Sequence, residues 1–291
     1  MSGASASAAP AEASSPRVRR GHLRLRVVLL VLGAVALLTG LYGGLWRLGL
    51  ALPHGAPLGD LHGPLMICGL FGTLISLERA AAVGENWPYA APALSALGSL
   101  ALLAGLPPIV GISCYALAAL AFTAVSLRVA LRQPALFTRT LLFGALALLA
   151  GDLRWMAGAT VPDATGWWLA FLILTIAGER LELSRILPPK PGGTALFVIA
   201  LVLLAAGAWI GIMNATGAAL FGFALLGLAA WLLRHDIALR NIRLRGQTRF
   251  FAACMLPGYC WLAVGGMLLI ATPPGESAYG YDMALLSLIH I

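Results

Sequence analysis

Charged residues are scarce in this chain of 291 residues: Asp, Glu, Lys and Arg make up 10% of it, whereas 60% of the residues are hydrophobic. Soluble globular domains carry about 25% charged residues, so the composition excludes a water-soluble globule. A disordered chain is excluded because the apolar fraction is too high, and collagen because the 34 glycines lack a three-residue period. The class that remains is a polytopic membrane protein.

Cysteine motifs and nucleotide-binding motifs are also missing. The four cysteines lie in or beside apolar stretches and form neither CxxC nor CxxCH. The sequence therefore predicts no disulfide framework, no zinc site and no covalently attached c-type haem. Because it has no Walker loop, no dinucleotide-binding glycine motif and no HExxH, nucleotide hydrolysis and zinc proteolysis find no support.

Apolar runs of about 20 residues, the length that crosses a bilayer core, follow one another along the chain, separated by short breaks rich in Gly, Pro or Arg. They predict an all-α, polytopic transmembrane helix bundle with nine complete spans, at residues 27–48, 61–83, 89–106, 109–130, 137–157, 165–187, 194–213, 217–234 and 249–270. A tenth apolar segment begins near Tyr281. Since the chain stops inside this segment, we expect a C-terminally truncated protein.

The positions of Lys and Arg indicate how the spans are oriented. With the amino terminus in the cytoplasm, all but two of the 19 basic residues fall at cytoplasmic loops or span ends, the exceptions being Arg47 and Arg154. This asymmetry is the one that fixes membrane topology. The formal charge of +8 therefore predicts a multi-pass protein of the bacterial inner membrane with the lipid bilayer as its partner, and it gives no support for nucleic-acid binding. The sequence identifies no protein partner.

Composition divides the chain into three ranges. Residues 1–22 begin with a low-complexity Ala/Ser/Pro stretch and predict a disordered cytoplasmic tail, and residues 23–285 predict the transmembrane helical domain. Residues 286–291 spell LSLIHI, which is the translation of a transposon-end adapter used in sequencing libraries. We therefore expect 286–291 to be a non-native, adapter-derived tail and His290 to have no functional role.

Two pairs of similar motifs predict a repeated unit of four helices. Gly-x-x-Arg closes the first span at Arg47 and the fifth span at Arg154. One span further on, LISLERAAAVG and TIAGERLELSR place the dipeptides Glu78-Arg79 and Glu179-Arg180 near the inner ends of their spans. Repeats in membrane proteins commonly place sites at their interface.

The first candidate site is His62 with Met66, at the outer start of the second span. The two residues are four positions apart and share one helix face, so they can offer an imidazole and a thioether to a haem or a copper ion. The alternative is structural: a histidine bonded to a loop carbonyl, beside a methionine that fills a gap.

Glutamates near the inner ends of two spans form the second candidate. A carboxylate inside a span is costly unless it is paired, protonated or facing water. Because neighbouring residues point about 100° apart on a helix, Glu78 and Glu179 are expected to form crossed ion pairs, with Arg180 and Arg79 respectively. These charges either clamp the helices together or line a path for protons or a substrate ion.

The third candidate combines Asp152 and Arg154, at the outer end of the fifth span, with Arg47 at the outer end of the first. Two outer arginines near His62 suit an anionic group such as the haem propionates, because guanidinium groups bind carboxylates bidentately. The alternative is a structural ion pair between Asp152 and Arg47.

The run HGPLMICGLFGTLISLERA in the second span resembles that of a group of bacterial polytopic membrane proteins and, distantly, the NnrS family, whose early helix carries a His, a Met and Gly-Phe/Leu-x-x-Thr. The resemblance implies an inner-membrane protein of about twelve helices that binds haem b or copper, and it matches His62 and Met66 to the motif His and Met. The His–Glu dipeptide of NnrS is His62-Gly63 in this chain, and Tyr281-Asp282 matches the opening of a His-rich tenth helix in the group.

Three functions follow from these observations. The first, which we favour, is haem or copper binding linked to nitric oxide response or respiratory redox chemistry. The second is a small-solute or proton-coupled transporter with Glu78 and Glu179 in its pathway. The third is a membrane scaffold without a ligand. Whether the protein is an enzyme stays open.

Overall fold

The computed structural model describes residues 16–185, 192–277 and 279–288, and every regular element within these ranges is helical. The elements in chain order are α1 (Pro16–Arg47), α2 (Gly55–Pro64), the π-helix η1 (Leu65–Phe71), α3 (Gly72–Val83), the 3₁₀ turn η2 (Trp87–Tyr89), α4 (Ala90–Leu103), α5 (Pro108–Arg132), α6 (Leu136–Met156), α7 (Val161–Ser184), α8 (Gly193–Ile210), α9 (Ala215–His235), α10 (Ala238–Asn241), α11 (Gln247–Ala271) and α12 (Gly280–Leu288).

Each of the nine predicted spans coincides with a helical segment. Among the described residues, eight segments are long and apolar enough to cross a membrane, one of them being the continuous rod of α2, η1 and α3 at Gly55–Val83. The third predicted span, 89–106, corresponds to the shorter apolar segment Trp87–Leu103. It ends early because Gly105 adopts a positive φ of 71° and the following Pro107-Pro108 disfavours helix before it.

The ends of the chain are described in part. Helix α1 begins at Pro16, so it starts within the range 1–22 that the sequence assigns to a tail, and residues 1–15 lie outside the described residues. Helix α12 coincides with the start of the predicted tenth segment and continues to Leu288, into the suspected adapter tail. His290 lies outside the described residues.

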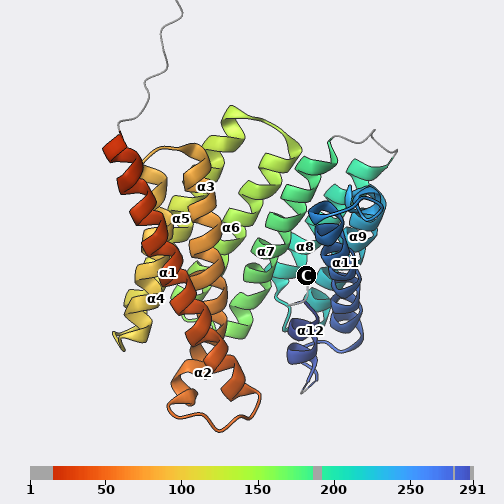
Figure 1. The fold of residues 1–291 in the computed structure, drawn as a ribbon. Helices are drawn as coiled ribbons and strands as arrows, with labels where there is room; N and C mark the ends of the chain where they lie inside the picture. The colour runs from red at the N-terminus through yellow and green to blue at the C-terminus, as the bar shows by residue number, and fades with distance from the viewer. Residues whose placement is uncertain (1–15, 186–191, 278, 289–291) are drawn as a thin grey trace, which may run out of the picture.

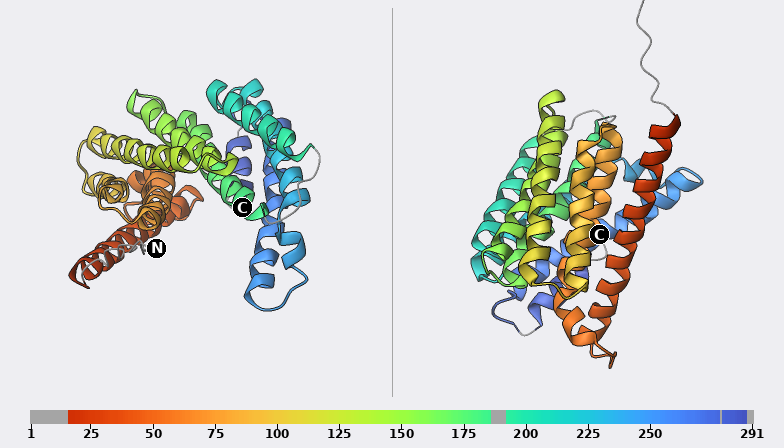
Figure 2. Two further views of the ribbon diagram at one scale, coloured as in Figure 1. Left: turned by 90° about the horizontal axis from the view of Figure 1, so that it is seen from above. Right: turned by 90° about the vertical axis from the view of Figure 1, so that its left-hand side faces the viewer.

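The long helices run side by side in a bundle (Figure 1). Seen from above, α1–α7 form one group and α8–α12 a second group that joins it at α7 (Figure 2). Large apolar side chains face outward on several helices: Leu38, Leu120 and Val202 are more than half exposed. Outward-facing apolar surface on a bundle of this length suits contact with lipid tails rather than water, and the architecture is that of an integral membrane protein.

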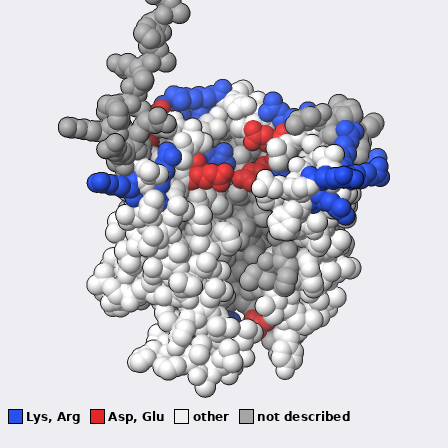
Figure 3. Space-filling model, viewed as in Figure 1, with Lys and Arg blue, Asp and Glu red and all other residues white. Residues whose placement is uncertain are grey.

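Lys and Arg gather at one end of the molecule, the end at which α1 begins (Figure 3). A network around Glu85, in the loop after α3, stabilises this end. Arg128 of α5 donates to both carboxylate oxygens of Glu85, one of them at 2.6 Å, and Trp87 donates its indole N–H at 2.8 Å. These hydrogen bonds, that from Arg128 first, lower the pKa of Glu85 below its ordinary value.

Candidate functional site

The site begins with an irregular stretch in the second membrane-spanning rod. Pro64 has no backbone N–H and so cannot complete the α-helical hydrogen-bond pattern at its position, and the next seven residues wind as the π-helix η1. Short π segments inside α-helices frequently mark functional sites. Here the backbone carbonyl of Cys68, within η1, accepts a hydrogen bond of 2.5 Å from the Ser95 hydroxyl of α4.

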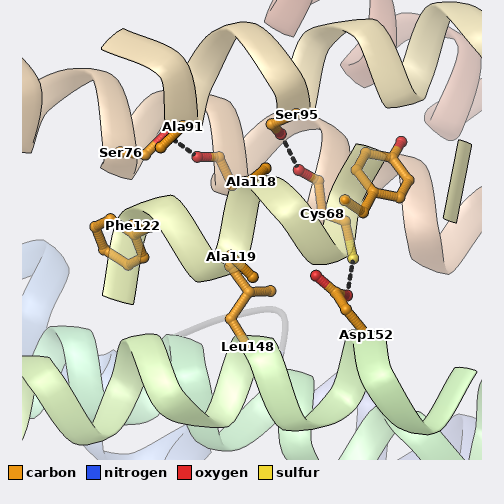
Figure 4. A pocket seen from close by; sticks show the side chains of 11 residues that line it. Cys68, Ser76, Ala91, Ser95, Ala118, Ala119, Phe122, Leu148 and Asp152 are labelled. Carbon is orange, nitrogen blue, oxygen red and sulfur yellow. Dashed lines mark hydrogen bonds between the residues drawn. The ribbon is translucent and has the colours of Figure 1, made fainter. Parts of the chain in front are cut away.

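The Cys68 side chain points across the bundle to Asp152, one turn before the end of α6 (Figure 4). Asp152 is 1% exposed. One carboxyl oxygen, Oδ1, accepts two hydrogen bonds, from the Trp168 indole N–H at 2.9 Å and from the Cys68 thiol at 3.2 Å. Both donors are neutral groups, so the buried carboxyl has hydrogen-bond partners on Oδ1 but forms no ion pair with any described residue.

The glycine that precedes Asp152 makes this arrangement fit. A Cβ atom on Gly151 would lie 2.5 Å from Cδ1 and 2.6 Å from Nε1 of Trp168. Such contacts are too short for real atoms, so only glycine allows the indole of α7 to lie against α6 at this level. Trp168 is itself fully buried and packs edge-on against Trp155, with ring centroids 5.7 Å apart. The indole position, and with it the N–H that reaches Asp152, is therefore fixed by packing.

The second carboxyl oxygen of Asp152, Oδ2, is buried, and no described residue donates a hydrogen bond to it. Asp152 lines a small cavity together with Cys68, Ser76, Ser95, Tyr115 and Phe122 (Figure 4). The cavity has a volume of ≈ 10 Å³, which is room for about one water molecule. An unpaired buried polar atom costs about 1–3 kcal/mol, so its persistence calls for a functional explanation or a bound water.

Hydroxyl groups surround the cavity and continue from it toward the end of the bundle where the basic residues gather. Ser99 shares a hydrogen bond of 2.9 Å with Tyr115 at the level of Gly69, and Thr73 donates to Ser95 at 3.0 Å closer to the basic end. Ser76, also on the cavity wall, is eight residues beyond Cys68. This places it about two turns further along the rod, two residues before Glu78 and three before Arg79.

The inner-end charges gather as predicted, but they do not pair as predicted. Glu179 interacts electrostatically with Glu78, Arg79, Arg180 and Glu182. The ion pairs within 4.0 Å among the described residues are Arg47–Asp282, Arg128–Glu85 and Arg132–Glu85, so the crossed pairs of Glu78 with Arg180 and of Glu179 with Arg79 are not formed.

The side chain of Arg180 explains part of this difference. Arg180 interacts with Tyr259 of α11, which also interacts with the buried Asp236. The guanidinium group of Arg180 therefore joins α7 to α11 and does not pair with Glu78 of α3.

His62 and Met66 share one face, as predicted, and that face contacts α1. Nδ1 of His62 forms a hydrogen bond of 2.7 Å with the backbone carbonyl of Gly40. A Cβ on Gly44 would lie 2.8 Å from Cε1 of His62, and a Cβ on Gly40 would lie 3.0 Å from Sδ of Met66. The glycines of α1 thus provide the space into which both side chains pack. The partner of His62 is a carbonyl of a helix, not of a loop.

The outer arginines do not meet Asp152. Arg47 lies 3.9 Å from Asp282 of α12, with both side chains about half exposed or more, and Arg154 is exposed. The ion pair between Asp152 and Arg47, the alternative that the sequence left open, is therefore not formed: Asp152 faces inward to η1 and α7, whereas Arg47 ends α1 at the surface. In the described parts of the chain, no group of three or more His, Cys, Asp and Glu side chains is placed to hold a metal ion.

Sequence reasoning selected Asp152 but missed its partners Cys68 and Trp168 and the neighbouring Ser95, which donates to the Cys68 carbonyl. One signal could have found some of them. Small residues recur at intervals of four, as in Cys68, Gly72 and Ser76 of one span and in Ser95 and Ser99 of the next, and this spacing places them on one helix face. No local signal marks Trp168, because its contact with Asp152 depends on how α6 and α7 pack.

Neither a curated protein nor a solved structure matches the chain. A family model described as "Domain of unknown function (DUF8744)" matches residues 26–289, from the first membrane-length helix to the end of α12. The match covers nearly the whole chain, and the protein therefore belongs to the DUF8744 family.

Proposed function

We propose that this protein is a proton-coupled transporter of the bacterial inner membrane, in which Asp152 binds the proton. One observation carries the proposal: within the membrane-spanning bundle, Oδ2 of Asp152 is buried, lacks a donor among the described residues and belongs to a carboxyl group that lines a small internal cavity. Ionisable residues inside membrane spans are rare and mark substrate, ion or proton pathways.

A purely structural role explains the site less well. Buried charged side chains in proteins are paired with an opposite charge. Among the described residues Asp152 has no such partner, because its donors Trp168 and Cys68 are neutral and both bind Oδ1. When Asp152 carries a proton, the new O–H donor lies at Oδ2 and faces the cavity. Release of that proton changes the charge of the bundle interior, which is the kind of local event that biases a conformational equilibrium.

The surrounding groups support a path between Asp152 and the inner end. The cavity wall includes Ser76. The charged cluster of Glu78, Arg79, Glu179 and Arg180 begins two residues beyond Ser76, on the side of the basic end. The gathering of Lys and Arg at this end supports a cytoplasmic orientation for it (Figure 3). In this proposal Asp152 holds the proton in the outer half of the bundle, and Glu78 and Glu179 exchange protons with the cytoplasm.

The test is proton movement into liposomes that contain the purified protein and a trapped pH-sensitive dye, driven by an imposed membrane potential. We expect the wild type to acidify the interior and Asp152→Asn to lose this flux. Asp60→Asn is the matched control, because Asp60 is an exposed carboxylate of α2 outside the cavity, and it should keep the wild-type rate. Equal fluxes through the wild type and Asp152→Asn, with both proteins folded, would refute the proposal.

A second candidate function is haem b or copper binding at His62 for nitric oxide response or respiratory redox chemistry, as the NnrS resemblance implies. The hydrogen bond from Nδ1 of His62 to Gly40 supports it, because metal-bound histidines commonly use their other ring nitrogen in this way. Nε2 of His62 and the thioether of Met66 would hold the group, and Arg47 and Arg154 would bind haem propionates. The bound group would supply one-electron chemistry.

An absorption spectrum of the purified protein tests this second candidate. A Soret band that His62→Ala removes and His54→Ala retains would favour haem at His62. A wild-type spectrum without a Soret band, together with metal analysis that finds no copper, would remove this function and leave the transport proposal in place.

A further inference from the structure

An apolar groove runs along the outside of the second helix group, between α9, α10 and α11. Its wall is formed by apolar side chains and one thiol: Leu233, Leu239, Leu256, Pro257, Cys260, Trp261 and Val264. The groove has a volume of ≈ 530 Å³, within the range of about 300–1,000 Å³ that is usual for small-molecule sites. It is open on one side, and it extends from the basic end of α9 to the middle of α11.

Four arginines follow directly at the basic end of this groove. Arg240, Arg243, Arg245 and Arg249 lie between the end of α9 and the first turn of α11, all exposed, in a stretch with no acidic residue from 237 to 249. None of the ion pairs found among the described residues involves them. Figure 3 shows the dense group of basic side chains that projects from this end of the molecule.

Large apolar side chains alternate with these arginines. Leu239 is 41% exposed, Leu244 52%, Phe250 65% and Phe251 63%. Leu239 also forms part of the groove wall, next to Arg240. A loop that served only to fix topology needs the positive charge but not the exposed apolar side chains or the groove below them. The combination suits a ligand with an anionic head and an apolar tail.

We propose that this groove binds one anionic phospholipid, with an acyl chain along α9 and α11 and the phosphate between Arg240 and Arg243. Guanidinium groups bind phosphate oxygens bidentately, and basic residues beside membrane helices attract anionic headgroups. The apolar wall offers no partner for a free anion, so the lipid, not inorganic phosphate, is the occupant. The site is separate from Asp152, and the inference does not depend on transport.

The headgroup arm of the test measures binding of phosphatidylglycerol and phosphatidylcholine to the purified full chain by native mass spectrometry. We expect phosphatidylglycerol to bind more tightly. Arg240→Gln/Arg243→Gln should weaken that binding about thirtyfold. The control Arg24→Gln/Arg139→Gln removes the same charge from exposed positions of α1 and α6 and should leave the affinity within about twofold. Equal binding of the two lipids, or equal losses in the two double variants, would overturn the proposal.

The acyl-chain arm uses two exposed cysteines of α11. Cys260 lines the groove and Cys254 does not, so Cys260→Phe should block phosphatidylglycerol binding and Cys254→Phe should not. Excess inorganic phosphate should fail to displace the lipid. Displacement by phosphate, or full lipid binding by Cys260→Phe, would show that the groove does not hold the acyl chain. A dimer seen by native mass spectrometry that Cys260→Phe dissociates would assign the groove to a second copy and contradict the lipid proposal.

Discussion

The hydrogen bonds to Asp152 predict different outcomes for two substitutions of this residue. Asp152→Asn keeps Oδ1 as the acceptor for both Trp168 at 2.9 Å and Cys68 at 3.2 Å, and it places the amide nitrogen at Oδ2, facing the cavity. Asp152→Ala removes the acceptor and leaves a buried indole N–H and a thiol without a partner. The alanine variant should therefore be less stable than the asparagine variant, although both lack the carboxyl group.

The size of this difference in the free energy of unfolding can be estimated in two ways. A stranded buried donor costs about 1–3 kcal/mol in soluble proteins, whereas hydrogen bonds between membrane helices average about 0.6 and reach about 1.7 kcal/mol in double-mutant cycles. The membrane value applies here, because unfolded helices in a micelle find other partners. We expect Asp152→Ala to lower the free energy of unfolding by about 1 kcal/mol more than Asp152→Asn.

The assay is unfolding by SDS in mixed micelles, followed by circular dichroism. Alanine also leaves a small cavity, so Trp168→Phe is added to each variant to separate that effect from the hydrogen bond. Trp168→Phe should cost about 0.6–1.7 kcal/mol more in the Asp152→Asn background than in the Asp152→Ala background. The same cost in both backgrounds would show that no hydrogen bond joins the indole to residue 152, and our account of the site would fail.

Two further predictions concern parts of the bundle outside this site. Gly44→Ala would place a Cβ 2.8 Å from His62 and should destabilise the protein by about 1–3 kcal/mol through overpacking, whereas Gly33→Ala, with its nearest atom at 3.9 Å, should be neutral or stabilising by up to about 1 kcal/mol. Unfolding in micelles checks both, and equal losses would contradict the packing of His62 on α1. The lowered pKa of Glu85 means that its contact with Arg128 stabilises the fold above the ordinary carboxyl pKa and that this contribution is lost as the pH falls through the lowered value. The melting temperature should therefore fall on acidification by more in the wild type than in Glu85→Gln, and identical pH profiles would refute this contribution.

The helices could be predicted from the sequence because each span is specified locally. Some twenty apolar residues in a row must form a helix in a bilayer, where every backbone polar group needs an internal partner. Turn residues then set the ends: Gly84, Gly105 and Gly158 all adopt positive φ after a helix. The shortness of the segment Trp87–Leu103 was the exception, since the predicted span ran on to residue 106 although Pro107-Pro108 signals an earlier stop.

The site could be predicted only in part, because its contacts join helices that are distant in sequence. Asp152 could be selected as a carboxylate in an apolar run, but Cys68 is 84 residues away from it. The alternative of an ion pair with Arg47 could not be decided from the sequence, because hydropathy does not show how a helix is rotated about its own axis, and that rotation turns Asp152 inward. The shared face of His62 and Met66 was predicted correctly from a spacing of four, which is a local property of one helix.

The protonation of Asp152 is the central claim, and infrared spectroscopy of the purified protein tests it most directly. Difference spectra recorded across a pH titration, in H₂O and in D₂O, report the C=O band of each carboxyl that takes up a proton. The wild type and Asp60→Asn should share a deuterium-sensitive carboxyl band that is absent from Asp152→Asn. A spectrum of Asp152→Asn that retains every carboxyl band of the wild type would show that Asp152 does not exchange a proton, and it would contradict the proposed transport function.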